Sequence, residues 1–263
     1  MATKMYLGNP PERIKKWIEK NYKQPTLDYL CFTAEEAGST ITMSKSGSAP
    51  AVYLETSPTG EEGSWTDYEV GITPKITLTN VGDKVYFRAR QDNERFGTSY
   101  NDYNQFVMTG KIAGSGNINT LLKANGSVLD LTANDIYRSY CYFKMFYNCT
   151  SLTQAPKLPA TELADYCYMC MFDSCLSLTQ APELPATTLK LYCYDHMFYN
   201  CKNLSSVTAY FENWGENADS TGYWLKNTSE TGILKCLKSN LIDGDIPRNP
   251  FTIPKTWTIE TID

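Results

Sequence analysis

The stretch that decides the fold is residues 141–166, CYFKMFYNCTSLTQAPKLPATELADY, because residues 167–192, CYMCMFDSCLSLTQAPELPATTLKLY, repeat it without a gap. A third copy, CYDHMFYNCKNLSSV, begins at residue 193, so the period is 26 residues. A fixed period of this length is typical of a solenoid, in which each unit buries its apolar side against its neighbours. The side chains expected in this repeat core are Cys141, Met145, Phe146, Cys149, Leu152, Cys167, Met171, Phe172, Cys175, Leu178, Cys193, Met197, Phe198, Cys201 and Leu204.

Within one unit, apolar residues follow one another at intervals of four, as in Leu163, Cys167, Met171 and Cys175. This spacing predicts an apolar stripe along a helix. The segment 178–185, LTQAPELP, contains two prolines, which remove backbone donors and favour extended conformations. Each unit is therefore predicted to be a helix followed by a short extended segment and a turn, and the stack to be an α/β solenoid.

The pattern M-F-x-x-C-x-S-L-T-x-A-P-x-L-P-A-T-x-L resembles the BspA-like class of leucine-rich repeats, over roughly residues 117 to 263. The resemblance implies a helix carrying aromatic residues and cysteine, then a short strand. The third copy loses the A-P-x-L-P segment after Ser206, and a tail rich in Trp, Tyr and Gly follows. Atypical terminal units seal the open end of a solenoid. Residues 113–263 are thus expected to form a BspA-like leucine-rich repeat domain with a C-terminal cap.

The repeated cysteines allow three interpretations. They can form a ladder of buried thiols, disulfides between repeats, or a zinc site built from Cys167-x-x-Cys170 and Cys193-x-x-His196. In the first copy Lys144 takes the place of Cys170 and His196. That column is therefore expected to be variable and exposed, which favours buried thiols and predicts neither a metal nor another cofactor.

Residues 26–112 have period-2 runs separated by Gly, Pro, Asn and Asp, a pattern of short strands. Together they predict an immunoglobulin-like β-sandwich with Trp65 as a core anchor, acting either as a plain scaffold or as a presenter of the repeats. The expected strands are 27–33, 39–44, 51–56, 64–70, 75–79, 84–90 and 103–111.

Residues 1–25 are predicted to form a third element, with a short strand over 4–8 and a helix that Asn9 caps and Pro10 begins. Its K-[IM]-Y-L-G-N start resembles attachment segments of bacteriophage head- and tail-fibre proteins. The apolar side of this helix either packs on the sandwich or serves docking and oligomerisation. The residues assigned to docking are Met5, Tyr6, Leu7, Ile14, Trp17 and Ile18.

The charge distribution and the motifs of the chain exclude several classes of function. Residues 1–25 hold six basic and two acidic side chains, a balance of +4, whereas the remaining 18 basic and 27 acidic side chains give −9. A body of that charge repels a phosphate backbone, so nucleic acid is not an expected partner. The N-terminus lacks a secretory h-region and no segment is apolar enough to span a membrane, which predicts cytoplasmic folding without membrane insertion. The chain has one histidine and no phosphate-binding loop, so no enzyme activity is expected.

Binding remains. The chain has 19 tyrosines, and the recurring ones either cover the repeat core or form an aromatic array that binds a partner. The recurring tyrosines are Tyr140, Tyr142, Tyr166, Tyr168, Tyr192 and Tyr194.

Two functions fit these observations. In the first, the protein belongs to a bacteriophage virion, as a head- or tail-fibre component that assembles in the host cytoplasm. It would dock on other capsid or tail proteins through its N-terminus, form a homo-oligomer (dimer or trimer), and present the repeats to a host-surface protein or glycan. In the alternative, it is a BspA-like adhesin on a bacterial cell surface.

Overall fold

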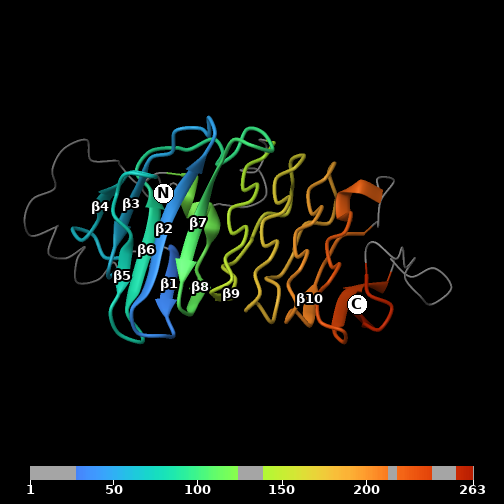
Figure 1. Ribbon diagram of the computed structural model, residues 1–263. Coiled ribbons are helices and arrows are strands. Elements are labelled where there is room, and N and C mark those ends of the chain that lie inside the picture. The colour runs from blue at the N-terminus through green and yellow to red at the C-terminus, as the bar shows by residue number, and fades with distance from the viewer. Residues whose placement is uncertain (1–27, 124–138, 213–217, 239–252, 263) are drawn as a thin grey trace, which may run out of the picture.

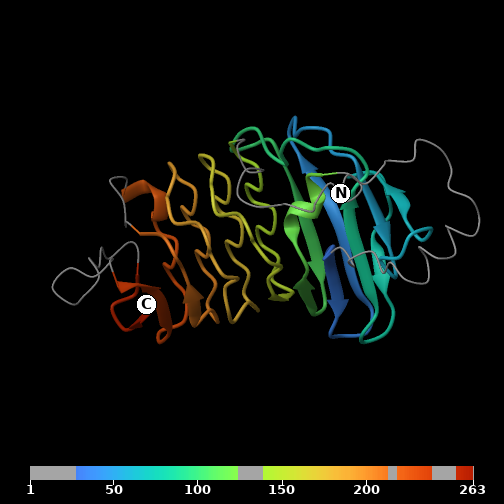
Figure 2. The same ribbon diagram turned by 180° about the vertical axis from the view of Figure 1, so that it is seen from behind.

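The structure is a computed structural model, and it describes residues 28–123, 139–212, 218–238 and 253–262. They form one elongated body, with a β-sandwich at one end and coils of the repeat stacked beside it (Figure 1, and from behind Figure 2). The predicted N-terminal strand and helix, with their docking residues, lie outside the described residues. None of the helices in the described ranges has the length and apolar character needed to cross a bilayer.

Two sheets make the sandwich, and each of the seven predicted strand ranges overlaps an observed strand. One sheet has the order β4-β3-β6-β1-β8-β9 and the other the order β5-β2-β7. The strands are β1 (Leu30–Ala34), β2 (Ser39–Ser46), β3 (Leu54–Ser57), β4 (Thr66–Tyr68), β5 (Ile76–Leu78), β6 (Lys84–Ala89), β7 (Tyr103–Thr109), β8 (Ile112–Ser115) and β9 (Leu152–Gln154).

Buried and partly open residues alternate along the strands, and the buried ones form the core of the sandwich. In β2, Ile41 and Met43 are buried while their neighbours are partly open, as expected for a strand with one face on a core. Phe32 from one sheet lies 5.0 Å, between ring centroids, from Phe106 of the other. Trp65 does not anchor this core: its ring is only half-buried, and it lies under the guanidinium of Arg88, 4.2 Å from the ring centroid.

The strand order is not that of an immunoglobulin domain, so this part of the prediction is wrong. In immunoglobulin domains the first two strands share a sheet. Here β1 pairs with β6 and β8, whereas β2 pairs with β5 and β7 in the opposite sheet. Period-2 patterns mark where strands are but carry no information on which strands pair.

The predicted helices of the solenoid are wrong as well. The described residues contain no α-helix. In place of a helix, residues 140–149 form successive turns in which every fourth residue has a positive φ: 61° at Tyr140, 55° at Lys144 and 59° at Asn148. The next two coils repeat this conformation at Tyr166, Cys170, Ser174, Tyr192, His196 and Asn200.

Backbone hydrogen bonds explain why turns replace the helix. Alternate amides bond to the next coil, as when the Phe146 amide donates to the Met171 carbonyl at 2.9 Å. The amides between them bond within the coil, as when the Met145 amide donates to the Tyr142 carbonyl at 3.2 Å. An α-helix would use nearly all of its amides internally, so half of the amides are diverted here to hold neighbouring coils together. We call this side of the coils, residues 140–149, 166–175 and 192–201, the turn face.

The extended half of each coil forms parallel strand contacts. β9 pairs with β8 of the sandwich, and at the far end β10 (Ser206–Thr208), β11 (Ile233–Leu237) and β12 (Thr258–Ile262) form a parallel sheet. Two short 3₁₀ helices complete the described elements, η1 (Ile118–Leu121) and η4 (Ala218–Thr221).

The sandwich covers the first coil. The amides of Phe96 and Phe106 donate to the carbonyls of Cys141 and Met145 at 2.7 and 2.8 Å. At the other end the fully buried ring of Trp224 lies 6.5 Å from that of Phe198. One hydrophobic core therefore runs from the sandwich through the coils to the C-terminal sheet.

Candidate binding face of the repeat coils

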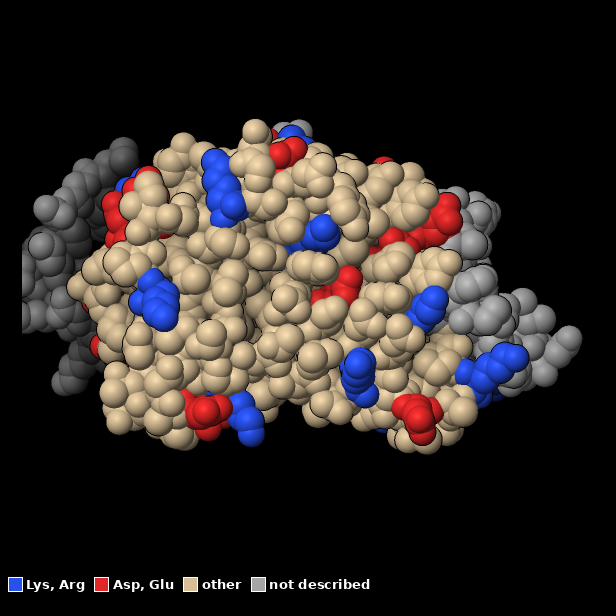
Figure 3. Space-filling model, in the orientation of Figure 1, with Lys and Arg blue, Asp and Glu red and all other residues tan. Residues whose placement is uncertain are grey.

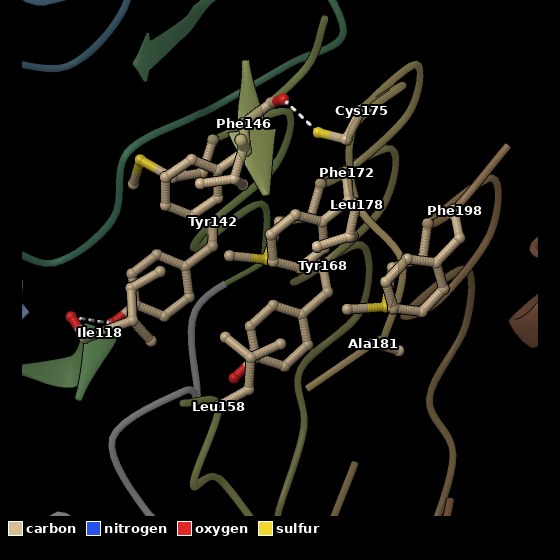
Figure 4. Packing of buried hydrophobic residues seen from close by; sticks show 14 of the residues in the cluster. Ile118, Tyr142, Phe146, Leu158, Tyr168, Phe172, Cys175, Leu178, Ala181 and Phe198 are labelled. Atoms are coloured by element: carbon tan, nitrogen blue, oxygen red, sulfur yellow. Dashed lines mark hydrogen bonds between the residues drawn. The ribbon is translucent and has the colours of Figure 1, made fainter. Parts of the chain in front are cut away.

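Inside the coils, equivalent side chains of successive repeats stack on one another. The rings of Phe146, Phe172 and Phe198 are 5.3 and 5.6 Å apart and within 5° of parallel, and Figure 4 shows this row beside the buried tyrosines. Phe106 extends the row into the sandwich at 5.3 Å. Each of the predicted repeat-core side chains is at most 1% exposed. Stacking at about the spacing of neighbouring strands favours side chains of one shape within the row of Phe146, Phe172 and Phe198.

The cysteines form ladders of free, buried thiols. The thiols of Cys149, Cys175 and Cys201 donate to the carbonyl oxygens of Phe106, Phe146 and Phe172 at 3.1, 3.2 and 3.0 Å. The bond from Cys175 is drawn in Figure 4. A small apolar side chain with one weak donor fits this place, which explains why cysteine recurs there.

The first prediction concerns these thiols. All nine cysteines of the chain are buried, and burial raises the pKa of Cys149, Cys175 and Cys201. We therefore expect the native protein at neutral pH to react with a thiol reagent such as Ellman's reagent only at the rate at which it unfolds, and to react fully in denaturant. Rapid labelling of several thiols in the native state would contradict the buried ladders.

The second prediction concerns the inner tyrosines Tyr142, Tyr168 and Tyr194, which are almost fully buried. The Tyr142 hydroxyl donates to Asn119 Oδ1 at 2.9 Å, but the buried Tyr168 hydroxyl has no hydrogen-bond partner among the residues that the structure describes. An unpaired buried hydroxyl costs about 1–3 kcal/mol. Tyr168→Phe is expected to leave stability unchanged or raise it, whereas Tyr142→Phe lowers it by about 1–2 kcal/mol. Urea unfolding of both variants tests this, and equal losses would count against it.

On the outside of the turn face, Tyr140, Tyr166 and Tyr192 form a second row of rings. Their centroids are 4.6 and 5.0 Å apart, with interplanar angles of 9° and 24°. The rings are half-buried. Because they cover one another's faces, a partner meets their edges. The row is therefore not a flat aromatic platform.

Beside this outer tyrosine row, the equivalent residues Lys144, Cys170 and His196 do not form the exposed column that was expected. Cys170 is only 4% exposed and Lys144 only 7%. The Lys144 ammonium lies over the rings of Tyr100 and Tyr103 from the sandwich, at 3.8 and 4.9 Å. Burial lowers the Lys144 pKa, and these cation–π contacts join the first coil to the sandwich.

Cys170 and His196 do not form a reactive pair of the kind found in cysteine hydrolases. His196 Nδ1 lies 2.8 Å from Asp195 Oδ2. Burial, with smaller contributions from the Asp173 and Asp195 carboxylates, raises the pKa of the Cys170 thiol to about 12. A nucleophilic cysteine requires a lowered pKa.

The four residues of the predicted zinc alternative are not brought together. Cys167 and Cys193 point into the core, where the pKa of Cys167 is raised by burial and by its neighbours Cys193 and Cys141. Cys170 instead neighbours Asp173, Asp195 and Lys144. Among the described residues, no group of three His, Cys, Asp or Glu side chains is placed to hold a metal ion.

The third prediction uses two aspartates whose pKa values shift in opposite directions. Burial raises the pKa of half-buried Asp173, so its contribution to stability is present below the unfolded-state pKa and is lost as pH rises through the raised value. Hydrogen bonds from Ser99 and Ser48 lower the pKa of Asp102, so its contribution is present above the unfolded-state pKa and is lost as pH falls through the lowered value.

At pH 7 we therefore expect Asp173→Asn to raise the melting temperature and Asp102→Asn to lower it. The difference between each variant and the parent should shrink as the pH falls through the folded-state pKa of the aspartate concerned. Melting curves from pH 3 to 8 measure this. A lower melting temperature for Asp173→Asn at pH 7 would contradict the assignment.

Sequence reasoning missed the groups that surround Lys144, since Tyr100 and Tyr103 lie about 40 residues away on the sandwich. The available signal was Lys144 itself, a charged residue in a column that otherwise holds Cys170 and His196.

Compared with known proteins, the chain matches no protein-family model, no curated protein and no solved structure.

Proposed function

We propose that this protein is a non-enzymatic structural component of a bacteriophage particle, of the head- or tail-fibre type. Its N-terminal segment docks on other capsid or tail proteins, and its repeat coils present the turn face to a host-surface protein or glycan. The observation that carries the proposal is the outer tyrosine row, Tyr140, Tyr166 and Tyr192, held at a regular spacing on a rigid stack.

Rigidity supports a presenting role. The coils are joined by backbone bonds between alternate residues and by the inner phenylalanine row, and the sandwich covers the first coil through its own backbone bonds. A partner that binds such a surface orders few side chains, because tyrosine has only two rotatable side-chain bonds before its hydroxyl. Ring edges and hydroxyl groups then supply both apolar contact and hydrogen bonds.

The surface seen in Figure 3 agrees with recognition by uncharged groups. Acidic and basic side chains are scattered among uncharged residues there, some of them side by side with opposite signs, without a field of one sign. Buried thiols with raised pKa values favour structure over chemistry, which supports a non-enzymatic role. The basic balance of residues 1–25 supports attachment through that segment to a more acidic assembly.

The alternative function, a BspA-like adhesin on a bacterial surface, is favoured by the repeat pattern M-F-x-x-C-x-S-L-T-x-A-P-x-L-P-A-T-x-L. Both functions use the turn face in the same way. They differ in whether the N-terminus docks on a particle.

Particle composition tests the main proposal. We expect the protein in purified phage particles as a dimer or trimer, and we expect deletion of residues 1–22 to abolish incorporation while the free protein stays folded. Absence from particles, with export to the cell surface, would refute the virion role and favour the adhesin.

A competition assay tests the turn face. Purified protein added to host cells should block particle adsorption, and the triple variant Tyr140→Ser, Tyr166→Ser and Tyr192→Ser should not. Tyr210→Ser, a half-buried tyrosine on the extended side of the coils, serves as the control and should compete like the parent. Equal competition by the triple variant would show that the tyrosine row does not bind.

A further inference from the structure

The last strand of the chain leaves one of its edges open. β12 ends the C-terminal sheet, whose order is β10-β11-β12, and it lies at the end of the molecule away from the sandwich, beside the C mark in Figure 1. Elsewhere on this side of the stack, the amides of one coil bond to the next, as when the Ala209 amide donates to the Lys235 carbonyl at 2.9 Å. In the described ranges no further strand follows β12, and its residues are partly or fully exposed.

The direction of the backbone shows which groups of β12 are unused. The Thr258 amide donates to the Gly232 carbonyl on the side of β11, at 2.8 Å. Because successive residues of a strand direct their backbone groups to opposite sides, Glu260 also faces β11, whereas Ile259 and Thr261 face outward. Neither the Ile259 amide nor the Thr261 amide donates to another backbone group among the residues described. Such an edge is a template for one more strand.

The features that normally protect a sheet edge are missing from β12. Natural edges are kept from pairing by short strands, by proline, or by charges that stay unpaired. The terminal strands of the two sandwich sheets, β4 and β5, have only three residues each. β12 has five residues and no proline, and its one charged side chain, Glu260, pairs with Lys235 of β11 at 3.5 Å. The edge is therefore open to a partner strand.

The same strand of a second copy fits this edge. When two β12 strands meet antiparallel about a two-fold axis through Glu260, Ile259 of each copy lies opposite Thr261 of the other. The outward groups then form hydrogen-bonded pairs, each exchanging both of its N–H···O=C bonds. The side chains of these residues continue the rows of buried Leu234 and Cys236, so the pairing also extends the core of both copies. Two-fold contacts of this isologous kind are the commonest in homo-oligomers.

We propose that the outer edge of β12 is a self-association site, at which two copies of this chain join their C-terminal sheets into one continuous sheet. Two short strands make a small contact, so the dimer is weak and forms at high concentration or where an assembly holds copies close together. The site uses neither residues 1–25 nor the turn face. The inference therefore goes beyond the function proposed above, and either can fail without the other.

The experiment is hydrogen exchange of single amides, followed by NMR on the full chain from about 20 µM to about 1 mM protein. The Ile259 and Thr261 amides should exchange more slowly as the concentration rises. The Glu260 amide, which faces β11, is the internal reference and should exchange equally slowly throughout. This readout needs no variant, and association through another part of the chain does not produce it. Fast exchange of Ile259 and Thr261 at every concentration would overturn the proposal.

Sedimentation velocity on three full-length variants provides the second measurement. Thr261→Pro removes an outward N–H without removing a bond to β11, so it should weaken the pairing at least about tenfold. Glu260→Gln removes the like charges that meet on the two-fold axis and should tighten the pairing about two- to fivefold. Glu183→Gln, at an exposed glutamate on another coil, is the control and should change nothing. Association that Thr261→Pro leaves unchanged, or that Glu183→Gln alters as much as Glu260→Gln does, would mean that another surface is responsible.

Discussion

Replacing Phe172 with alanine is expected to lower the free energy of unfolding by about 3–5 kcal/mol, the usual cost of emptying a core site of this size. Phe172 is fully buried and stacks on Phe146 and Phe198 on either side. Neither neighbouring ring can fill the space, because the backbone bonds of the turn face hold the coils in register. Urea unfolding, followed by tryptophan fluorescence, measures the loss.

The control for this variant lies four residues further along the same coil. Leu176 is 37% exposed, so Leu176→Ala should change stability by less than about 1 kcal/mol. Similar losses for Phe172→Ala and Leu176→Ala would mean that the inner row does not hold the coils together. If Phe172→Ala does not fold, Phe172→Leu provides a milder version in which about half of the loss is expected.

The second large effect is expected at Gly116, where the sandwich meets the first coil. Its φ is +74°, and a Cβ placed there would run into the carbonyl oxygen of Tyr29. Its own carbonyl accepts the amide of Lys157 at 2.8 Å. Gly116→Ala combines left-handed strain with a backbone clash, so we expect a loss of about 3–5 kcal/mol.

Gly38 is the matched control, because its φ is +76° but nothing lies within 4 Å of an added Cβ. Gly38→Ala should cost only the strain of the left-handed conformation, about 1–2 kcal/mol. Asparagine tolerates that conformation, so Gly38→Asn should be nearly neutral while Gly116→Asn should remain damaging. Equal losses at the two sites, measured by thermal unfolding, would show that the close approach to Tyr29 does not matter.

The repeat period and the identity of the buried rows could be predicted from the sequence, since equivalent residues at a fixed period share one environment. The conformation of the unit could not. An interval of four fits a helical stripe that drifts slowly, but it also fits turns that return every fourth residue to the same side. Only the second keeps Cys141, Met145 and Cys149 equally buried, without drift. The sequence offered a hint, because the run Leu163, Cys167, Met171 and Cys175 keeps an interval of four throughout.

Contacts between residues far apart in the chain could not be predicted from the sequence either. The pairing of β1 with β6 and β8, the stacking of Phe106 on Phe146 and the rings around Lys144 join residues far apart in the chain. No local pattern encodes such pairs. The candidate binding face could be predicted only as a list of recurring tyrosines, which the structure divides into the inner row and the outer row.

NMR scalar couplings across hydrogen bonds in the deuterated protein test whether the coils are joined through alternate backbone amides in place of a helix. We expect couplings from the amide nitrogens of Tyr142, Phe146 and Phe172 to the carbonyl carbons of Cys167, Met171 and Met197. Couplings from these nitrogens to the carbonyl four residues earlier in the chain, the signature of an α-helix, would contradict it.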